Sequence, residues 1–181
     1  DPFCDPFCGS GTIPIEAALI AKNRAPGLDR SFAAQKWKNM DSKLWLDAAE
    51  EAMDKEFHGN YDIWGGDIDP AAVELAKHNA ELAGVEDCIR FEVADAGKFH
   101  RDSEYGQLVT NPPYGERLME KKEAEELYRV FGAALRDLPP KWRVLVLSSH
   151  TEFERCFGRP ADKKRKLYNG MLKCDVFMYG K

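Results

Sequence analysis

The sequence predicts an α/β protein built around a mostly parallel β-sheet. Strand-like runs alternate with amphipathic helical stretches along the 181 residues, a pattern typical of strand–helix–strand units. Residues 142–148 form a nearly continuous apolar run, which favours a strand buried on both faces. Near the end of the chain, Asn169-Gly170 lies between two strand-like runs and predicts an antiparallel hairpin.

The first half of the chain should hold two strands and three helices. We expect a strand over residues 3–7 and a helix over 13–22, with Pro14 in its first turn, where a missing N–H costs nothing. Residues 23–60 read as an insertion that carries one helix after an irregular stretch. That helix is indicated by apolar residues at helical spacing and a possible cap at its start. These residues are Trp45, Ala49, Ala52 and Met53, with Asp41 or Ser42 as the cap.

A second strand and a well-delimited helix follow the insertion. The strand is expected over residues 61–67 and the helix over 70–83. Asp69 followed by proline is a helix N-cap signal, and Gly84 is a stop signal.

The second half should supply the remaining strands. Two are expected over 89–94 and 107–111, and a strongly periodic helix over 123–138 precedes the buried strand at 142–148. The hairpin strands are expected over 166–168 and 172–179.

Composition excludes several classes of protein. Hydrophobic residues make up 44% and charged residues 31%, with a mean hydropathy of −0.52, as in an ordinary globular domain rather than a membrane bundle or a disordered chain. The net charge of −5 and isoelectric point of about 5.5 exclude a globally basic nucleic-acid binder, although not a local basic patch.

The cysteines and the first residues of the chain indicate the cellular compartment that we expect for the protein. Five cysteines without a CxxC pair predict free thiols in a reducing cytoplasm and no metal site. No basic, apolar leader is present, so we expect a cytoplasmic protein. Asp-Pro-Phe-Cys occurs twice in succession, and we treat residues 1–4 as an addition in front of a single domain.

The first motif with chemical content is the segment from Asp5 to Thr12. Its glycines lie between a strand and a helix, where a ligand can approach the backbone closely. The segment matches neither the G-x-G-x-x-G fingerprint nor a P-loop. Asp5 suits a cationic group and would repel a pyrophosphate. A plain tight turn is the alternative interpretation.

Two further carboxylates follow strands. Asp67, at the end of the second strand, can accept hydrogen bonds from both hydroxyls of a ribose. Asp95, after the third strand, could accept a hydrogen bond from an adenine amine, although an exposed loop Asp is an equal alternative.

The most specific signal is Asn111-Pro112-Pro113-Tyr114 at the end of the fourth strand. The prolines stiffen the backbone and remove N–H donors, which leaves carbonyl acceptors. The Asn111 oxygen adds another acceptor and Tyr114 an aromatic face, so the segment can hold a planar group that bears an amine. A rigid turn with a packed tyrosine is the alternative.

A basic run approaches the hairpin. It comprises Lys163, Lys164, Arg165 and Lys166, and Arg117 follows the Asn111 motif. These residues are candidates for contact with RNA phosphates, and a solvated strand is the alternative.

Together these motifs resemble the class I S-adenosylmethionine-dependent amino-methyltransferases. Within that class the chain resembles the bacterial THUMP-linked 23S rRNA guanine-N2 methyltransferases, a group (UPF0020) also labelled N6-adenine-specific DNA methylases. The resemblance extends from Asp5 over essentially the whole chain. Apart from the motifs above, it depends on residues 13–18, 25–27, 111–118 and 163–170.

The resemblance implies a Rossmann-like, seven-stranded, mostly parallel sheet with helices on both faces. It also implies an RNA substrate, a THUMP domain that this sequence lacks, and S-adenosylmethionine as the cofactor. The implied cofactor contacts are Asp5, Phe7, Cys8, Gly9, Ser10, Gly11, Thr12, Asp67, Ile68, Asp95, Ala96 and Asn111. The implied base-binding, catalytic residues are Asn111, Pro112, Pro113 and Tyr114.

Two other functions stay open on the motifs alone. The Asn-Pro-Pro-Tyr sequence also occurs in adenine-N6 methyltransferases, so the motif indicates the chemistry better than the base. A fragment that binds the cofactor without catalysis is the third hypothesis.

Overall fold

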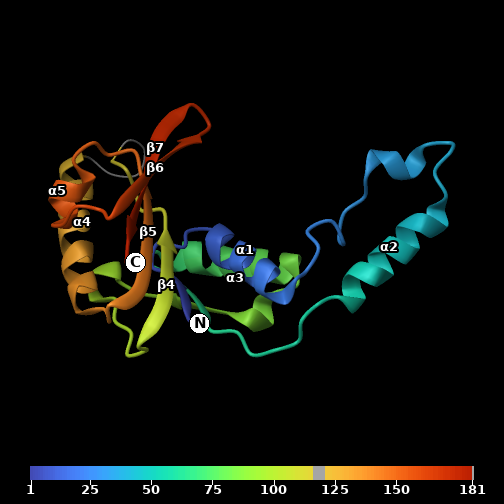
Figure 1. Ribbon diagram of the computed structural model, residues 1–181, viewed down its shortest axis with the longest axis horizontal. Helices are drawn as coiled ribbons and strands as arrows, with labels where there is room; N and C mark the ends of the chain where they lie inside the picture. The colour runs from blue at the N-terminus through green and yellow to red at the C-terminus, as the bar shows by residue number, and fades with distance from the viewer. Residues whose placement is uncertain (116–120, 181) are drawn as a thin grey trace.

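The computed structural model describes residues 1–115 and 121–180, and these form one seven-stranded sheet with helices on both faces (Figure 1). The strand order is β3-β2-β1-β4-β5-β7-β6. Every neighbouring pair from β3 to β5 is parallel, whereas β7 is antiparallel to both β5 and β6. The predicted fold class is therefore confirmed.

The strands are β1 (Phe3–Asp5), β2 (Ile63–Asp67), β3 (Ile89–Val93), β4 (Tyr105–Thr110), β5 (Lys141–Ser148), β6 (Lys163–Asn169) and β7 (Leu172–Tyr179). The helices are α1 (Thr12–Lys22), α2 (Ser42–Asp54), α3 (Pro70–Ala83), α4 (Lys121–Ala134) and α5 (Phe153–Phe157). Four single 3-10 turns complete the list: η1 (Ala33–Lys36), η2 (Glu86–Cys88), η3 (Ala96–Lys98) and η4 (Leu135–Asp137).

The first strand is shorter than expected. It ends at Asp5 instead of residue 7, because the Asp5 carboxylate accepts the Phe7 N–H (3.1 Å) and starts a turn. Phe3 and Cys4, which the sequence analysis set apart from the domain, pair with both β2 and β4. Cys4 is buried in the core.

Two other boundaries differ from expectation by three residues or more. The helix expected to reach residue 138 ends at Ala134 and continues as the 3-10 turn η4. β6 begins at Lys163, three residues before the expected start, because its lysine-rich sequence pairs fully with β7. The N-cap role of Asp69 is confirmed, since its carboxylate accepts the Ala71 N–H.

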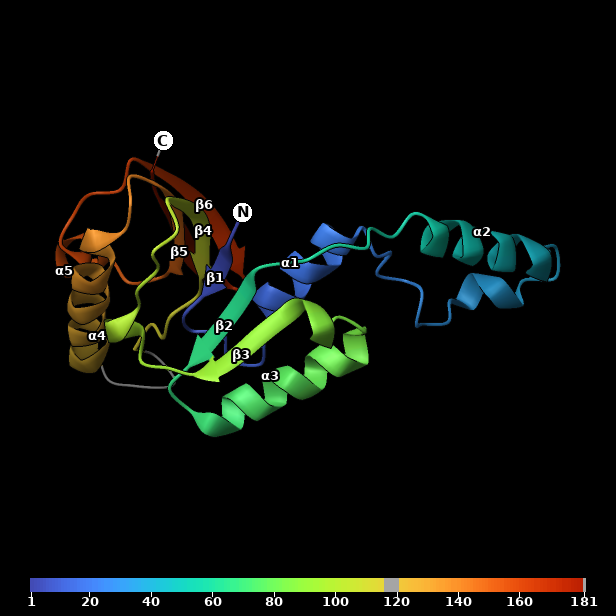
Figure 2. The same ribbon diagram turned by 90° about the horizontal axis from the view of Figure 1, so that it is seen from below.

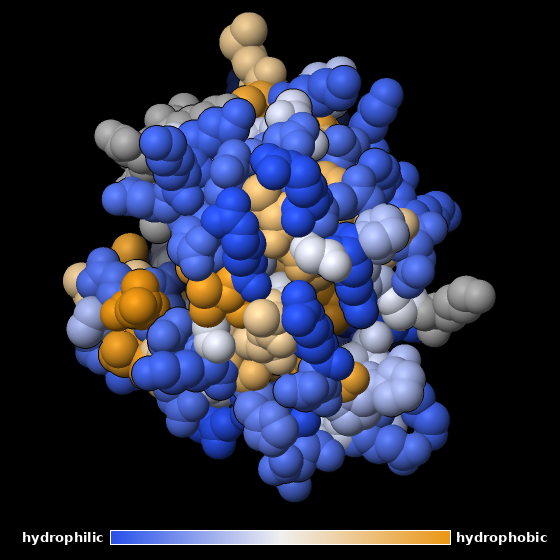
Figure 3. All heavy atoms as spheres, turned by 90° about the vertical axis from the view of Figure 1, so that its left-hand side faces the viewer, coloured by the Kyte–Doolittle hydropathy of each residue, from blue (hydrophilic) through white to orange (hydrophobic). Residues whose placement is uncertain are grey.

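Two hydrophobic clusters lie on opposite faces of the sheet. α1 and α3 cover β2 and β3 with a cluster that includes Ala18, Val73 and Ala76 (Figure 2). α4 and α5 cover the other face, where Tyr128 and Phe153 are fully buried. The outer surface of this α4–α5 side is mostly hydrophilic, with small apolar patches between the charged side chains (Figure 3).

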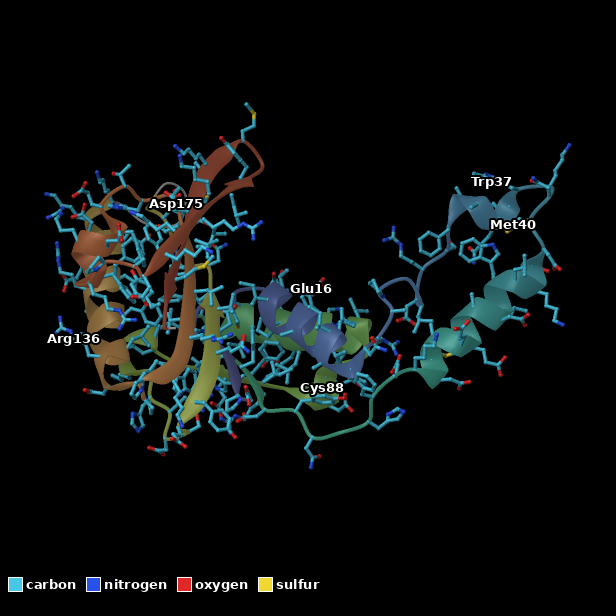
Figure 4. The ribbon with its side chains drawn as sticks, in the orientation of Figure 1. Glu16, Trp37, Met40, Cys88, Arg136 and Asp175 are labelled. Carbon is cyan, nitrogen blue, oxygen red and sulfur yellow. The ribbon has the colours of Figure 1, made fainter. Side chains whose placement is uncertain are left out.

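Residues 23–60 form an arm that stands away from this body. The arm carries η1 and α2 and extends beyond α1, with Trp37 and Met40 near its far end (Figure 4). The described arm contains no buried residue. It is attached at its root, where Arg24 donates to Glu56 (2.7 Å) and Phe57 N–H donates to the Lys22 carbonyl (2.7 Å).

Candidate active site

The candidate site lies at the carboxyl edge of the parallel strands, where the sheet order reverses. β1 pairs with β2 on one side and β4 on the other, so the loops after these three strands meet at one edge. Ligands of open α/β sheets bind at this position. The glycine loop and the Asn-Pro-Pro-Tyr loop, predicted separately from sequence, are thus neighbours.

The buried carboxyl group of Asp5 connects these two loops. Asp5 is 1% exposed, and its Oδ1 accepts hydrogen bonds from the Thr110 hydroxyl (2.6 Å) and the Phe7 N–H. Its Oδ2 is buried without a hydrogen-bond partner among the described residues. Burial raises the pKa of Asp5 to about 7, although the Thr110 and Phe7 hydrogen bonds act to lower it. A cation beside Oδ2 would satisfy the group.

The glycine loop is a tight turn with an open side. Gly11 donates to the Cys8 carbonyl (2.8 Å) and, together with Gly9, adopts positive φ. A Cβ on Gly9 would have no neighbouring atom within 4 Å, whereas one on Gly11 would meet Ala76 at 3.0 Å. Gly9 therefore faces free space and Gly11 packs against α3. Asn79 of α3 further fixes the loop by donating to the Ser10 carbonyl (2.8 Å).

The other residues of the glycine loop differ in which of their atoms could contact a ligand. Ser10 and Thr12 are exposed, with their hydroxyls 3.3 Å apart. Cys8 is buried, and burial raises the pKa of its thiol to about 12, which excludes a thiolate nucleophile at neutral pH. The Phe7 ring packs edge-on against Phe131 of α4 (5.1 Å between centroids), so its backbone is the part left for ligand contact.

Asp67 is placed beside the glycine loop, at the end of β2. Its Oδ2 accepts the Gly9 N–H (3.0 Å) and its Oδ1 the Asp69 N–H (3.0 Å). Each oxygen keeps a second lone pair, so the carboxylate can still accept ribose hydroxyls. The neighbouring Ile68 side chain is 72% exposed.

The third acidic candidate has a structural role as well. Asp95 is exposed and caps η3 by accepting the Gly97 N–H (2.8 Å). Ala96 is buried in the core cluster, so only its backbone could face a ligand.

The Asn-Pro-Pro-Tyr loop leaves Asn111 exposed, and the Tyr114 hydroxyl donates to its Oδ1. The expectation of free carbonyls needs one correction. The Pro113 carbonyl already accepts the Tyr128 hydroxyl (2.6 Å), because α4 places that buried tyrosine directly behind the loop. Pro112 is buried at the start of the turn. Arg117 lies outside the described residues.

Tyr128 belongs to a chain of hydrogen bonds that the sequence did not indicate. His150 N–H donates to Ser148 Oγ (3.1 Å), and Ser148 Oγ lies 3.3 Å from the Tyr128 hydroxyl. Since Tyr128 donates its proton to Pro113, the Ser148 hydroxyl is the donor to Tyr128. The backbone of the Asn-Pro-Pro-Tyr loop is thus fixed from β5 and α4. Burial lowers the pKa of His150 and keeps its imidazole neutral.

The predicted basic run does not form one patch. Because side chains alternate along β6, Lys163 and Arg165 lie on one face and Lys164 and Lys166 on the other. Lys164 pairs with Glu154 of α5 (2.7 Å).

Further features of the described residues concern metal ions, thiols and membranes. No group of three or more His, Cys, Asp or Glu side chains could hold a metal ion there. All five cysteines are buried free thiols. None of the described helices has the length and apolar character to cross a bilayer.

Two hollows lie away from the loops that follow β1, β2 and β4. One, of about 370 Å³, is at the amino ends of β4 and β5, and the other, of about 420 Å³, is at the root of the arm.

Comparison with known proteins agrees with this geometry. Residues 1–177 match the UPF0020 family, described as an RMKL-like methyltransferase domain. YpsC of Bacillus subtilis (strain 168) is 47% identical over 98% of this chain and 46% of its own length. The ribosomal RNA large subunit methyltransferase K/L of Shewanella baltica (strain OS185) is 43% identical over 97% of this chain and 25% of its own length. The chain thus spans half or less of these curated relatives.

Two solved structures superpose closely. SMU.472, solved in complex with SAH, has a TM-score of 0.95 and 43% identity, covering 100% of this chain and 48% of that one. A Listeria monocytogenes protein (str. 4b F2365), described as a predicted N6-adenine-specific DNA methylase, has a TM-score of 0.92 and 46% identity, covering 99% of this chain and 47% of that one.

Proposed function

The chain belongs to the UPF0020 family of RMKL-like methyltransferase domains, and from this premise we propose that it methylates an exocyclic amine of a nucleobase in RNA. The methyl donor is S-adenosylmethionine, whose sulfonium supplies an activated methyl group, and the favoured target is guanine N2 in 23S rRNA. The observation that carries the proposal is the hydrogen bond from Thr110 to Asp5, which joins the cofactor loop to the base-binding loop.

The residues of the glycine loop suit the proposed cofactor. The unpartnered Asp5 Oδ2 suits the ammonium of its methionine moiety, and the open side of Gly9 admits it to the backbone. Asp67 can accept from the ribose, and Asp95 and the Ala96 backbone can face the adenine. A structural relative carries SAH, the demethylated product of this cofactor.

The base-binding loop has to orient a weak nucleophile. An exocyclic amine conjugated to its ring reacts poorly unless its protons are held and its developing charge is stabilised. Asn111 Oδ1 and the Pro112 carbonyl are the acceptors for those protons, and Tyr114 supplies the aromatic face. A base within a duplex would have to flip out to reach Tyr114.

Substitution of Asn111 by alanine tests this assignment. We expect Asn111→Ala to lose most methyl transfer, about 100-fold or more, because the amine loses an oriented acceptor. SAH affinity, measured by calorimetry, should stay within a few-fold. Near-normal turnover of Asn111→Ala would refute the role.

Nucleoside analysis of the modified RNA tests the base. We expect N2-methylguanosine after reaction with S-adenosylmethionine and unmodified 23S rRNA. N6-methyladenosine would instead support the adenine activity for which the Listeria relative is described. Absence of both methylated nucleosides, together with a thermal shift on adding SAH, would support a fragment that binds the cofactor without catalysis, and absence of the shift as well would support a fragment that neither binds nor reacts.

A further inference from the structure

The β6–β7 hairpin extends beyond the edge of the sheet as a two-stranded ribbon. The pairing of β5 with β7 ends at Ser148↔Asp175, but β6 and β7 continue to pair as far as Asn169↔Leu172. The ribbon therefore projects past the carboxyl end of β5, as Figure 1 shows for the red hairpin. This is the edge at which the candidate site lies.

The base of the ribbon contacts the base-binding loop. Cys174 of β7, which pairs with Leu167 just beyond the end of β5, has its Sγ 4.0 Å from the Tyr114 hydroxyl. Tyr114 in turn donates to Asn111. A polymer whose base occupies that loop would therefore pass close to the ribbon.

The charge of the ribbon opposes that of the whole chain. Residues 166–173 contain two lysines and no acidic residue, and three further basic residues precede them at 163–165, whereas the net charge of the chain is −5. Lys164 is paired with Glu154. Lys166 and Lys173 are both exposed, Lys166 opposite Asp175 at the base of the ribbon and Lys173 opposite Tyr168 on its projecting part. Such a local excess of positive charge favours a phosphate backbone.

The ribbon also exposes large apolar side chains. Tyr168, on β6 next to the turn, is 72% exposed, and Met171, in the turn itself, is fully exposed. Single exposed apolar residues are common, but an aromatic ring between lysines is typical of surfaces on which nucleic-acid bases stack.

We propose that the ribbon formed by residues 166–173 binds the single-stranded RNA that flanks the methylated base. Tyr168 and Met171 contact the flanking bases, and Lys166 and Lys173 contact phosphates. The inference depends on the proposed function, because it extends the substrate from one base to its neighbours.

Two variants test the ribbon. We expect Tyr168→Ala to weaken binding of a single-stranded RNA oligonucleotide about 5- to 150-fold, from the loss of one base stack. The double variant Lys166→Glu, Lys173→Glu should lower the slope of log affinity against log salt by about 1.4 or more, which corresponds to two phosphate contacts. Fluorescence anisotropy at several salt concentrations measures both.

A matched control separates local from general effects of charge. Arg143→Glu reverses one charge near the amino end of β5, far from the ribbon, and should leave the slope near that of the parent, whereas each single variant, Lys166→Glu or Lys173→Glu, should lower it by about 0.7. SAH affinity should be unchanged in all variants, which shows that they are folded. Parent-like RNA affinity and slope in both ribbon variants would overturn the inference while leaving the proposed function intact. A parent protein that binds SAH but neither binds nor methylates RNA would overturn both.

Discussion

Asp5 is the side chain whose ionisation the fold opposes most directly. Burial raises its pKa from 3.8 to about 7, so between these values the folded protein holds a proton that the unfolded chain releases. The contribution of this bound proton to the free energy of unfolding is fully present below pH 4 and is lost as the pH rises through 7.

We therefore expect Asp5→Asn, which cannot ionise, to flatten the pH dependence of stability. Between pH 5.5 and 8.5 the melting temperature of the parent should fall by several degrees more than that of the variant. Thermal unfolding without ligand measures both. Parallel curves would contradict a buried, proton-binding Asp5.

Ligand binding should depend on the same proton. A cation beside Oδ2 favours the ionised carboxyl, so SAH binding should release a proton near pH 6.5 and strengthen as the pH rises to 8. Calorimetry in buffers of different ionisation enthalpy measures this release. It should disappear in Asp5→Asn, and persistence there would assign the proton to another group.

Tyr128 is expected to act on turnover through the loop that it supports. Tyr128→Phe keeps the ring and removes the hydroxyl, which donates to the Pro113 carbonyl and accepts from Ser148. We expect kcat to fall about 10-fold, roughly 1.4 kcal/mol, while SAH affinity changes less than 2-fold. Ser148→Ala removes the bond to Tyr128 and the acceptor of the His150 N–H but leaves the Tyr128–Pro113 bond in place, so it should have a smaller effect. A lower melting temperature with unchanged kcat would show a purely structural role.

At the scale of elements, Gly11 should matter mainly for the stability of the fold and Gly9 mainly for cofactor affinity. Gly11→Ala combines a φ of +85° with contacts of 3.0 and 3.2 Å to Ala76 of α3, so we expect a loss of about 2–4 kcal/mol in the free energy of unfolding. Gly9→Ala has a φ of +50° and free space, so its loss should be about 1 kcal/mol.

Cofactor affinity should fall more in Gly9→Ala than in Gly11→Ala, the opposite of the order expected for stability. The Gly9 methyl group would project into the space assigned to the ligand, and SAH affinity should fall at least 10-fold in that variant. Urea unfolding and calorimetry of both variants check the contrast. Equal losses in both properties would show that the two glycines do not divide these roles.

The elements that the sequence predicted correctly are those whose signals are local. Asp69-Pro70 and Gly84 delimit α3, and Asn169-Gly170 predicts the hairpin, whose turn lies one position later at Gly170-Met171. Each of these signals needs only its own chain neighbours. The bond from Tyr128 to Pro113 joins residues 15 positions apart on different elements, and the one from Thr110 to Asp5 joins residues 105 positions apart. Such contacts depend on which strands are neighbours, and periodicity does not specify that.

At the scale of the whole molecule, body and arm differ in what stabilises them. The body buries two clusters against one sheet, so its elements should unfold together. The arm has 13-residue α2 as its longest element, and exposed Leu46 and Met53 share a stripe of that helix seven residues apart. The helix was predicted correctly from a different stripe, of which Trp45, Ala49 and Ala52 are half-buried and only Met53 is exposed. Trp45 stacks on Phe32 (5.6 Å between centroids).

Hydrogen exchange should therefore divide the chain in two. An isolated helix of this length is marginal in water, so amides of residues 42–54 should exchange far faster than those of β4 and β5. SAH should slow exchange in the loops after β1, β2 and β4, and in the body as a whole, because a ligand of the folded state suppresses global opening. It should leave the rates in α2 unchanged, since the arm can open while the site stays intact. Equal protection of α2 and β5, or slowing of α2 by SAH, would show that arm and body form one cooperative unit.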